Sequence, residues 1–309
     1  MKKHFKKILL GILVILVVAF GFTGNYFYNF ALNPKVDKSA IVNQDSDGNK
    51  EDKKAVENWF ETTKKELTMD SVTKNKLVGY KFENPGAKKW IIVVHGYTSS
   101  SFKMANYIKK FYDMGYNVFA PDLIAHGKSE GEFISMGGYD STDLVNWIKK
   151  ISEDSGNADI ALFGISMGAA TVMNSLGKNL PSNVKVFIED SGYVNLKTEF
   201  TYQLKKLFNL PSFPVIPAAN TMTKLRAGYF FGDVDATEAL KNTKLPALVL
   251  HGEEDGFVPI EHGKAAYELI NSKKEFHSFP GVKHVQAERK FREQYWNIVG
   301  EFLNKNFNN

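Results

Sequence analysis

A serine within the sequence G-I-S-M-G, residues 164–168, is the residue best placed for chemistry in this chain. The apolar run before it, residues 160–163, predicts a strand, and the run after it, residues 167–176, predicts a helix. A serine in a tight strand-to-helix turn presents its hydroxyl at a helix N-terminus, where the dipole favours developing negative charge. We therefore expect Ser166 to be a nucleophile.

A serine nucleophile needs a base to take its proton and an acid to orient that base. Among the downstream histidines, His284 lies in P-G-V-K-H-V, a predicted loop between the last strand and the last helix, from which a side chain can reach over the sheet. His277 lies within a strand pattern, His251 ends a strand and His262 opens a helix. We expect His284 to be the base.

The orienting acid is expected after the next-to-last strand, in the sequence H-G-E-E-D-G-F-V-P. Asp255 precedes a glycine, a local turn signal that would let its carboxylate point inward. Glu253 and Glu254 are suited to a solvated loop, and Asp190, at the end of the preceding strand, is the reserve candidate. Asp255 is therefore the predicted acid.

Acyl transfer also needs donors for the oxyanion that forms on the carbonyl oxygen. The backbone N–H of Met167, directly after the serine, is one predicted donor. The backbone N–H of Tyr97, in the loop after an early strand, is the other. His95 precedes Ser166 in the chain and is expected to support this loop. This mechanism requires no cofactor and no metal.

Strands and helices alternate from about residue 72 onward. The strands are continuous apolar runs, which is typical of a mainly parallel sheet covered by helices on both faces. The predicted strands are 77–82, 90–94, 118–120, 160–163, 184–188, 247–250 and 275–279, and the predicted helices are 101–113, 139–151, 167–176, 262–270 and 288–302. Residues 192–244 interrupt the alternation, and we expect them to form a small helical cap over the carboxyl ends of the strands.

The N-terminal segment is typical of a membrane anchor. Four lysines lie within residues 1–7, and the stretch from 8 to 30 is uncharged and long enough to cross a bilayer as a helix. The positive-inside bias then predicts a cytoplasmic basic tail and an extracytoplasmic domain at 71–309. A cleaved signal peptide is the alternative. Residues 31–70 are interpreted as a flexible spacer (33–50) and an amphipathic helix (51–67).

Composition narrows the possible partners. The formal charge is +5, and the four N-terminal lysines account for four of those charges, so the folded domain has no basic surface for nucleic acid. The chain has no cysteine, which excludes disulfides and thiolate chemistry. The expected partners are a small ester or acyl substrate and the membrane. The oligomeric state is left open.

Five motifs together resemble the α/β-hydrolase superfamily over about residues 72–305, and most closely its serine aminopeptidase-like and monoglyceride lipase-like bacterial members. They are H-G-Y, A-P-D-L-I-A-H-G-K-S-E-G, G-I-S-M-G, H-G-E-E-D-G-F-V-P and G-V-K-H. Many relatives carry Gly-His-Gly where this chain has Ala125-His126-Gly127. The resemblance implies an α/β-hydrolase fold and hydrolysis of carboxylic esters or related acyl bonds through an acyl-enzyme.

Three functions are weighed. The first is a carboxylesterase- or lipase-like serine hydrolase, and the aromatic and leucine content of the cap indicates an apolar acyl or aromatic group. The second is a serine aminopeptidase, which needs acidic residues to meet a free amino terminus; Asp233, Asp235 and Glu238 of the cap are available. The third is a surface-tethered binding protein with a vestigial triad.

Overall fold

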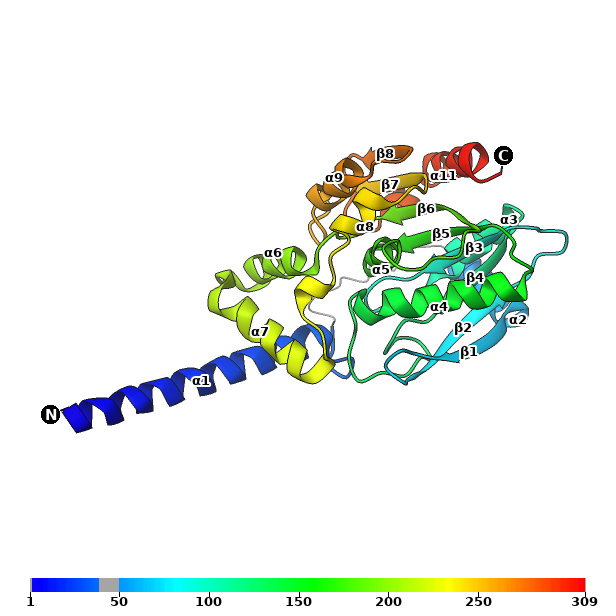
Figure 1. The fold of residues 1–309 in the computed structure, drawn as a ribbon. Helices are drawn as coiled ribbons and strands as arrows, with labels where there is room; N and C mark the ends of the chain where they lie inside the picture. Colours follow the sequence, from blue (N-terminus) through cyan, green and yellow to red (C-terminus); the bar gives the residue numbers. More distant parts are fainter. Residues whose placement is uncertain (1, 39–49, 309) are drawn as a thin grey trace.

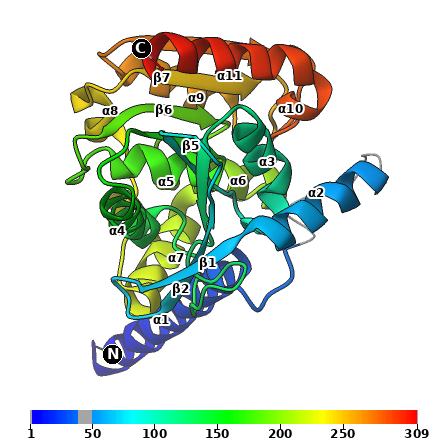
Figure 2. The same ribbon diagram turned by 90° about the vertical axis from the view of Figure 1, so that its right-hand side faces the viewer.

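The structure is a computed structural model that describes residues 2–38 and 50–308. Within these residues the chain forms one eight-stranded sheet in the order β1-β2-β4-β3-β5-β6-β7-β8 (Figures 1 and 2). Pairing is antiparallel from β1 to β4 and parallel from β4 to β8. The strands are β1 (Lys65–Asp70), β2 (Lys76–Phe82), β3 (Trp90–Val94), β4 (Asn117–Pro121), β5 (Ile160–Ile165), β6 (Val184–Asp190), β7 (Ala247–Gly252) and β8 (Lys274–Phe279).

Helices cover both faces of this sheet. One apolar layer receives side chains from α4 (Gly138–Asp154), α5 (Met167–Ser175) and α9 (Ile260–Leu269). The other receives them from α2 (Lys50–Thr63), α3 (Ala105–Asp113) and α11 (Arg292–Asn306). Two short helices, η1 (Phe102–Met104) and α10 (Ala287–Lys290), precede α3 and α11. Strands β3 to β7 are almost entirely buried, as continuous apolar runs between two helical layers must be. The predicted fold class is confirmed.

The segment before the sheet differs from its prediction. The amphipathic helix expected over residues 51–67 ends at Thr63, and Lys65–Asp70 forms the edge strand β1. Leu67 and Met69 alternate with polar residues, a period of two that suits an antiparallel partner, and they pair with Gly79 and Leu77 of β2. Phe60 anchors the shortened helix to the aromatic side chains of the neighbouring strand.

Between β6 and β7 the chain leaves the sheet and forms helices, in the interval predicted to be the cap. They are α6 (Leu196–Phe208), α7 (Ser212–Ala227), η2 (Phe231–Asp233) and α8 (Thr237–Asn242). The side chain of Asn195 caps α6 by accepting a hydrogen bond from the Thr198 N–H, 3.0 Å away. Asn209 ends the helix in the left-handed conformation. Asn195 and Asn209 therefore set the two ends of α6, and both act through adjacent residues.

Helix α1 (Lys2–Leu32) extends away from the domain at its N-terminal end and packs against α7 at its C-terminal end (Figure 1). Every side chain from residue 3 to 20 is exposed. The segment Lys3–Leu32 is long and apolar enough to cross a membrane. At Gly24 a Cβ atom would collide with the carbonyl of Ala218, so the two helices meet at van der Waals distance there.

Most of the predicted spacer, residues 39–49, lies outside the described residues. The described part, 33–38, turns back on the helix it follows. The Lys38 ammonium is buried and donates to the carbonyls of Asn29 and Phe30, at 3.1 and 2.6 Å. A cation at a helix C-terminus satisfies carbonyls that have no intrahelical partner. The chain after α1 is therefore fastened to the C-terminal end of that helix.

Candidate active site

Ser166 occupies the turn between β5 and α5. Its backbone has φ 55° and ψ −120°, a conformation that side chains rarely adopt. The flanking glycines make this turn possible because a Cβ at Gly164 would meet the Gly168 carbonyl, and a Cβ at Gly168 would collide with the carbonyl of Val94 in β3. The Ser166 N–H donates to the Asp190 carbonyl at 2.8 Å. Ser166 is thus held between β3 and β6, the two strands that flank β5 in the sheet.

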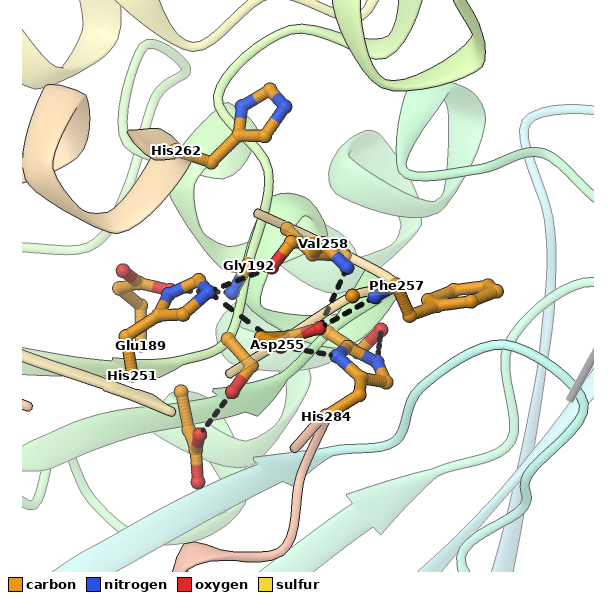
Figure 3. Close-up of polar contacts among 12 residues, drawn as sticks. Glu189, Gly192, His251, Asp255, Phe257, Val258, His262 and His284 are labelled. Carbon is orange, nitrogen blue, oxygen red and sulfur yellow. Dashed lines mark hydrogen bonds and ion pairs between the residues drawn. The ribbon is translucent and has the colours of Figure 1, made fainter. Parts of the chain in front are cut away.

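His284 contacts Asp255 with one ring nitrogen (Figure 3) and Ser166 with the other. Its Nε2 atom is 2.9 Å from the Ser166 Oγ, and its Nδ1 atom is 2.7 Å from the Asp255 Oδ2. An ionised carboxylate can only accept, so Nδ1 carries the proton and Nε2 is left to accept from the serine. The structure thus brings together the three residues predicted from the sequence in a hydrogen-bonded chain.

Asp255 is buried and held by the turn that follows β7. Its Oδ1 accepts from the backbone N–H groups of Phe257 and Val258, at 2.8 and 2.9 Å. The His251 Nε2 lies 3.6 Å from the Asp255 Oδ2 but 2.9 Å from the Val258 carbonyl, to which it donates (Figure 3). Burial lowers the pKa of His251, so its imidazole is neutral. His251 therefore braces the turn that positions the acid.

The other predicted acids do not contact His284. Asp190 accepts from the Tyr295 hydroxyl and the Ser191 hydroxyl, each at 2.8 Å, and burial raises its pKa to about 6. Glu253 and Glu254 are exposed, as expected of solvated loop acids. The geometry selects Asp255 from the candidates that the sequence offered.

The two predicted oxyanion donors flank the serine. Met167 is the first residue of α5, where a backbone N–H has no partner within its own helix. On the opposite side, the backbone of Gly96 lies against the serine, because a Cβ built there would be 3.2 Å from the Ser166 Cβ. Tyr97 follows and lines the same cavity as Ser166 and Met167. Their role as donors stays a prediction.

Two buried histidines hold the loop that carries Tyr97. His95 Nε2 accepts from the Leu123 N–H at 3.0 Å, and its Nδ1 donates to the Gly96 carbonyl at 2.8 Å. His126 Nε2 accepts from the Thr98 N–H at 3.2 Å. Burial lowers the pKa of His95 to about 4 and that of His126 to about 3, so both rings stay neutral and keep these bonds. His95 lies where the sequence predicted it, and His126 is a second support that sequence reasoning did not find.

Two cavities of different character meet at Ser166. The first is apolar and lies between the cap and the end of α1; its apolar lining includes Phe27, Phe30, Ala31, Phe200, Leu204, Leu207, Phe208, Val215, Ile216, Ala219 and Phe231. The second is more polar and lies on the His284 side; its polar lining includes Ser99, Lys206, Glu254, Lys283 and Gln286. The nucleophile therefore separates an apolar pocket from a polar cleft.

Glu199 on α6 is the acidic side chain in the described lining of the apolar pocket. It is buried; its Oε1 accepts from Gln203 at 2.9 Å, and its Oε2 lies 3.5 Å from the His262 Nε2. His262 Nδ1 accepts from a backbone N–H, so its proton is on Nε2 and faces the glutamate. Sequence reasoning had named Asp233, Asp235 and Glu238 instead, and all three are exposed and line neither cavity.

Comparison with known proteins identifies similar sequences. The model of the family described as serine aminopeptidase, S33, matches residues 85–226, a range that contains Tyr97 and Ser166 and ends before Asp255. The uncharacterized protein YqkD of Bacillus subtilis (strain 168) is 27% identical over 301 residues, covering 96% of this chain and 97% of that protein.

Solved structures with the same fold are also found. The esterase Pf2001 of Pyrococcus furiosus superposes with a TM-score of 0.65 at 25% identity, covering 90% of this chain and 98% of that one. The acylaminoacyl peptidase of Pyrococcus horikoshii shares the fold alone, with a TM-score of 0.61 at 18% identity over 78% of this chain and 41% of that one. The chain has the α/β-hydrolase fold, as its motifs predicted, and these similarities support a place in that superfamily and hydrolytic activity.

Proposed function

We propose that this protein is a serine hydrolase that cleaves carboxylic esters through an acyl-enzyme. The observation that carries the proposal is the hydrogen-bonded chain from Ser166 through His284 to Asp255, at the junction of an apolar pocket and a polar cleft. A serine becomes nucleophilic when a base within hydrogen-bond reach removes its proton as it attacks.

The reaction has two halves. The Ser166 Oγ attacks the ester carbonyl carbon while its proton passes to the His284 Nε2, and Asp255 stabilises the imidazolium that forms. The N–H groups of Met167 and Tyr97 hold the oxyanion. The C–O bond to the alcohol then breaks, and His284 returns the proton to the leaving oxygen. Water repeats the sequence on the acyl-enzyme, so that ester and water yield acid and alcohol.

The two cavities assign the two parts of the ester. Burying an apolar group in the pocket beneath the cap releases water from apolar surface on both sides, which favours an acyl chain there. The cleft on the His284 side contains the amines of Lys206 and Lys283, which favour a polar leaving alcohol. The proposed substrate therefore has an apolar acyl group and a polar alcohol.

The proposal places this site outside the cytoplasmic membrane. Helix α1 would span the bilayer, with the lysines of residues 1–7 on the cytoplasmic side and the domain at 71–309 on the other. Removal of a signal peptide is the alternative. N-terminal sequencing of the protein recovered from membranes distinguishes the two: a retained N-terminus supports the anchor, and a start near residues 22–24 contradicts it.

Aminopeptidase activity is the second candidate, and Glu199 is the observation that favours it. A buried carboxylate in the pocket could pair with the ammonium of a free amino terminus. The predominantly apolar lining favours the ester. Under the aminopeptidase reading, Glu199→Gln would abolish turnover of amino-acid arylamides; under the ester reading, arylamides are not cleaved and Glu199→Gln retains esterase activity.

The deciding experiment is fluorophosphonate labelling of the full chain in detergent, followed by a panel of p-nitrophenyl esters and amino-acid arylamides. Ser166→Ala is the matched control because it removes only the attacking oxygen. We expect labelling and ester turnover in the natural protein and neither in the variant. An unlabelled natural protein with no turnover would support the vestigial-triad reading and overturn this proposal.

A further inference from the structure

The C-terminal end of α1 forms part of the apolar pocket. Phe27, Phe30 and Ala31 line the same cavity as Ser166. The rings of Phe27 and Phe30 each lie 5.1 Å, centroid to centroid, from the ring of Phe208 on α6, edge to face. The helix that is interpreted as a membrane anchor from its sequence thus also contacts the space next to the nucleophile.

Polar contacts fix this end of α1 in place. The Tyr97 hydroxyl donates to the Ala31 carbonyl at 2.7 Å, and the Ile134 N–H donates to the Leu32 carbonyl at 2.8 Å. The Arg226 guanidinium lies 4.2 Å above the Tyr28 ring and donates to the Asn25 side chain at 2.9 Å. These contacts come from the loop that carries Tyr97, from the loop before α4 and from α7. A helix end held from three directions is a rigid wall.

We propose that the last two turns of α1, from Phe27 to Leu32, are a specificity-determining wall of the acyl-binding site. The wall sets the length of the acyl chain that the pocket accepts. This inference rests on the proposed esterase function and adds to it a substrate class, esters of fatty acids of limited chain length. It also assigns a second role to a segment whose composition indicates only membrane insertion.

The positions of the side chains that line the pocket indicate how it limits the length of the acyl chain. Pocket residues that remain partly exposed include Phe27 and Phe30 on α1 and Phe208 on α6, so the open edge of the pocket lies between these two helices. Removing a ring there extends the pocket, whereas enlarging Ala31, which lines its wall, shortens it. Each methylene of the acyl chain that the pocket gains or loses changes binding by about fourfold, so the two substitutions act in opposite directions on long chains.

The test measures kcat/KM for p-nitrophenyl dodecanoate and butyrate with the full chain in detergent, and uses their ratio. We expect Phe27→Ala to raise the ratio and Ala31→Leu to lower it, each by about fourfold or more, the effect of burying one methylene. Phe22→Ala is the matched control: the residue is on the same helix, 74% exposed, and does not line the pocket. A loss of folding would lower both rates together and leave the ratio unchanged.

Fluorophosphonate labelling of Ser166 reports that each variant is folded, and Ala31→Val replaces Ala31→Leu if labelling is lost. If the dodecanoate-to-butyrate ratio of both labelled variants stayed within about twofold of that of the natural protein, the proposed role of the wall would be overturned. The esterase proposal would remain intact. A natural protein that is neither labelled nor active would instead overturn the esterase proposal, and the wall with it.

Discussion

The Tyr97 hydroxyl donates to the Ala31 carbonyl at 2.7 Å, which ties the loop proposed to hold the oxyanion to the last turn of α1. The two residues lie 66 positions apart in the sequence. We therefore expect Tyr97 to have two separate functions: its backbone N–H would hold the oxyanion, and its side chain orients that backbone against the helix.

Tyr97→Phe tests this link. The variant removes one hydrogen bond, which contributes about 1 kcal/mol, and keeps the ring. We expect kcat for a short ester to fall about fivefold because the loop loses its orientation, which is measured by steady-state kinetics. Tyr116→Phe is the control, since its hydroxyl bonds Asn308 far from the site; an equal loss of kcat there would contradict the link.

Asp255→Asn tests the acid. The amide fits the same space but cannot fix the proton on the His284 Nδ1, and we expect kcat to fall by about 10³-fold or more, as for other triads that lose this charge. Stopped-flow or steady-state ester hydrolysis measures the effect. Glu253→Gln removes an exposed acid that belongs to the same loop but lines neither cavity, and it should leave kcat unchanged.

Glu189 should make the folding stability of the protein depend on pH. Burial raises its pKa to about 8, and one of its carboxylate oxygens accepts from the Gly192 N–H at 2.9 Å (Figure 3). Between the unfolded pKa, about 4.3, and about 8, the folded state keeps a proton that the unfolded state has lost. The contribution of Glu189 to folding stability is therefore complete below this window and declines as pH rises through it.

Glu189→Gln removes that titration. Compared with the natural protein, the variant should gain stability as the pH is raised from 5 to 8, by several degrees in the difference between the two Tm values. Calorimetry at a series of pH values gives the comparison. A difference in Tm that stays constant over the series would show that Glu189 does not titrate in this window.

Ala125 lies at φ 61°, in the left-handed region that favours glycine. A left-handed alanine costs roughly 1 kcal/mol relative to glycine, so Ala125→Gly should raise the free energy of unfolding by up to about 1 kcal/mol. Chemical denaturation measures it. Ala265→Gly, within helix α9, should instead lower the free energy of unfolding by about 1 kcal/mol. If both substitutions changed the free energy of unfolding in the same direction, backbone strain at Ala125 would be contradicted.

Sequence patterns predicted β2 to β8 and the turn at Ser166 because each depends on a few adjacent residues, whereas the edge strand β1 was taken for the end of a helix. The wall formed by Phe27 and Ala31 could not be predicted, since an apolar helix surface that contacts protein has the same composition as one that contacts lipid. Gly24 was the one available signal, a small residue where two helices can approach closely. Glu199 lies among the apolar positions of α6, where nothing in the local sequence distinguishes it.

The contact of α1 with the domain has a consequence for how the protein meets its substrate. A hydrolase on a loose tether would sample many tilts and heights above a bilayer. Here the helix that would enter the bilayer runs without a break into the domain (Figure 1), where its last residues line the apolar pocket at Ser166. With α1 inserted, the pocket keeps a constant height and tilt over the lipid surface, and lateral diffusion of enzyme and amphiphile in two dimensions determines how often they meet.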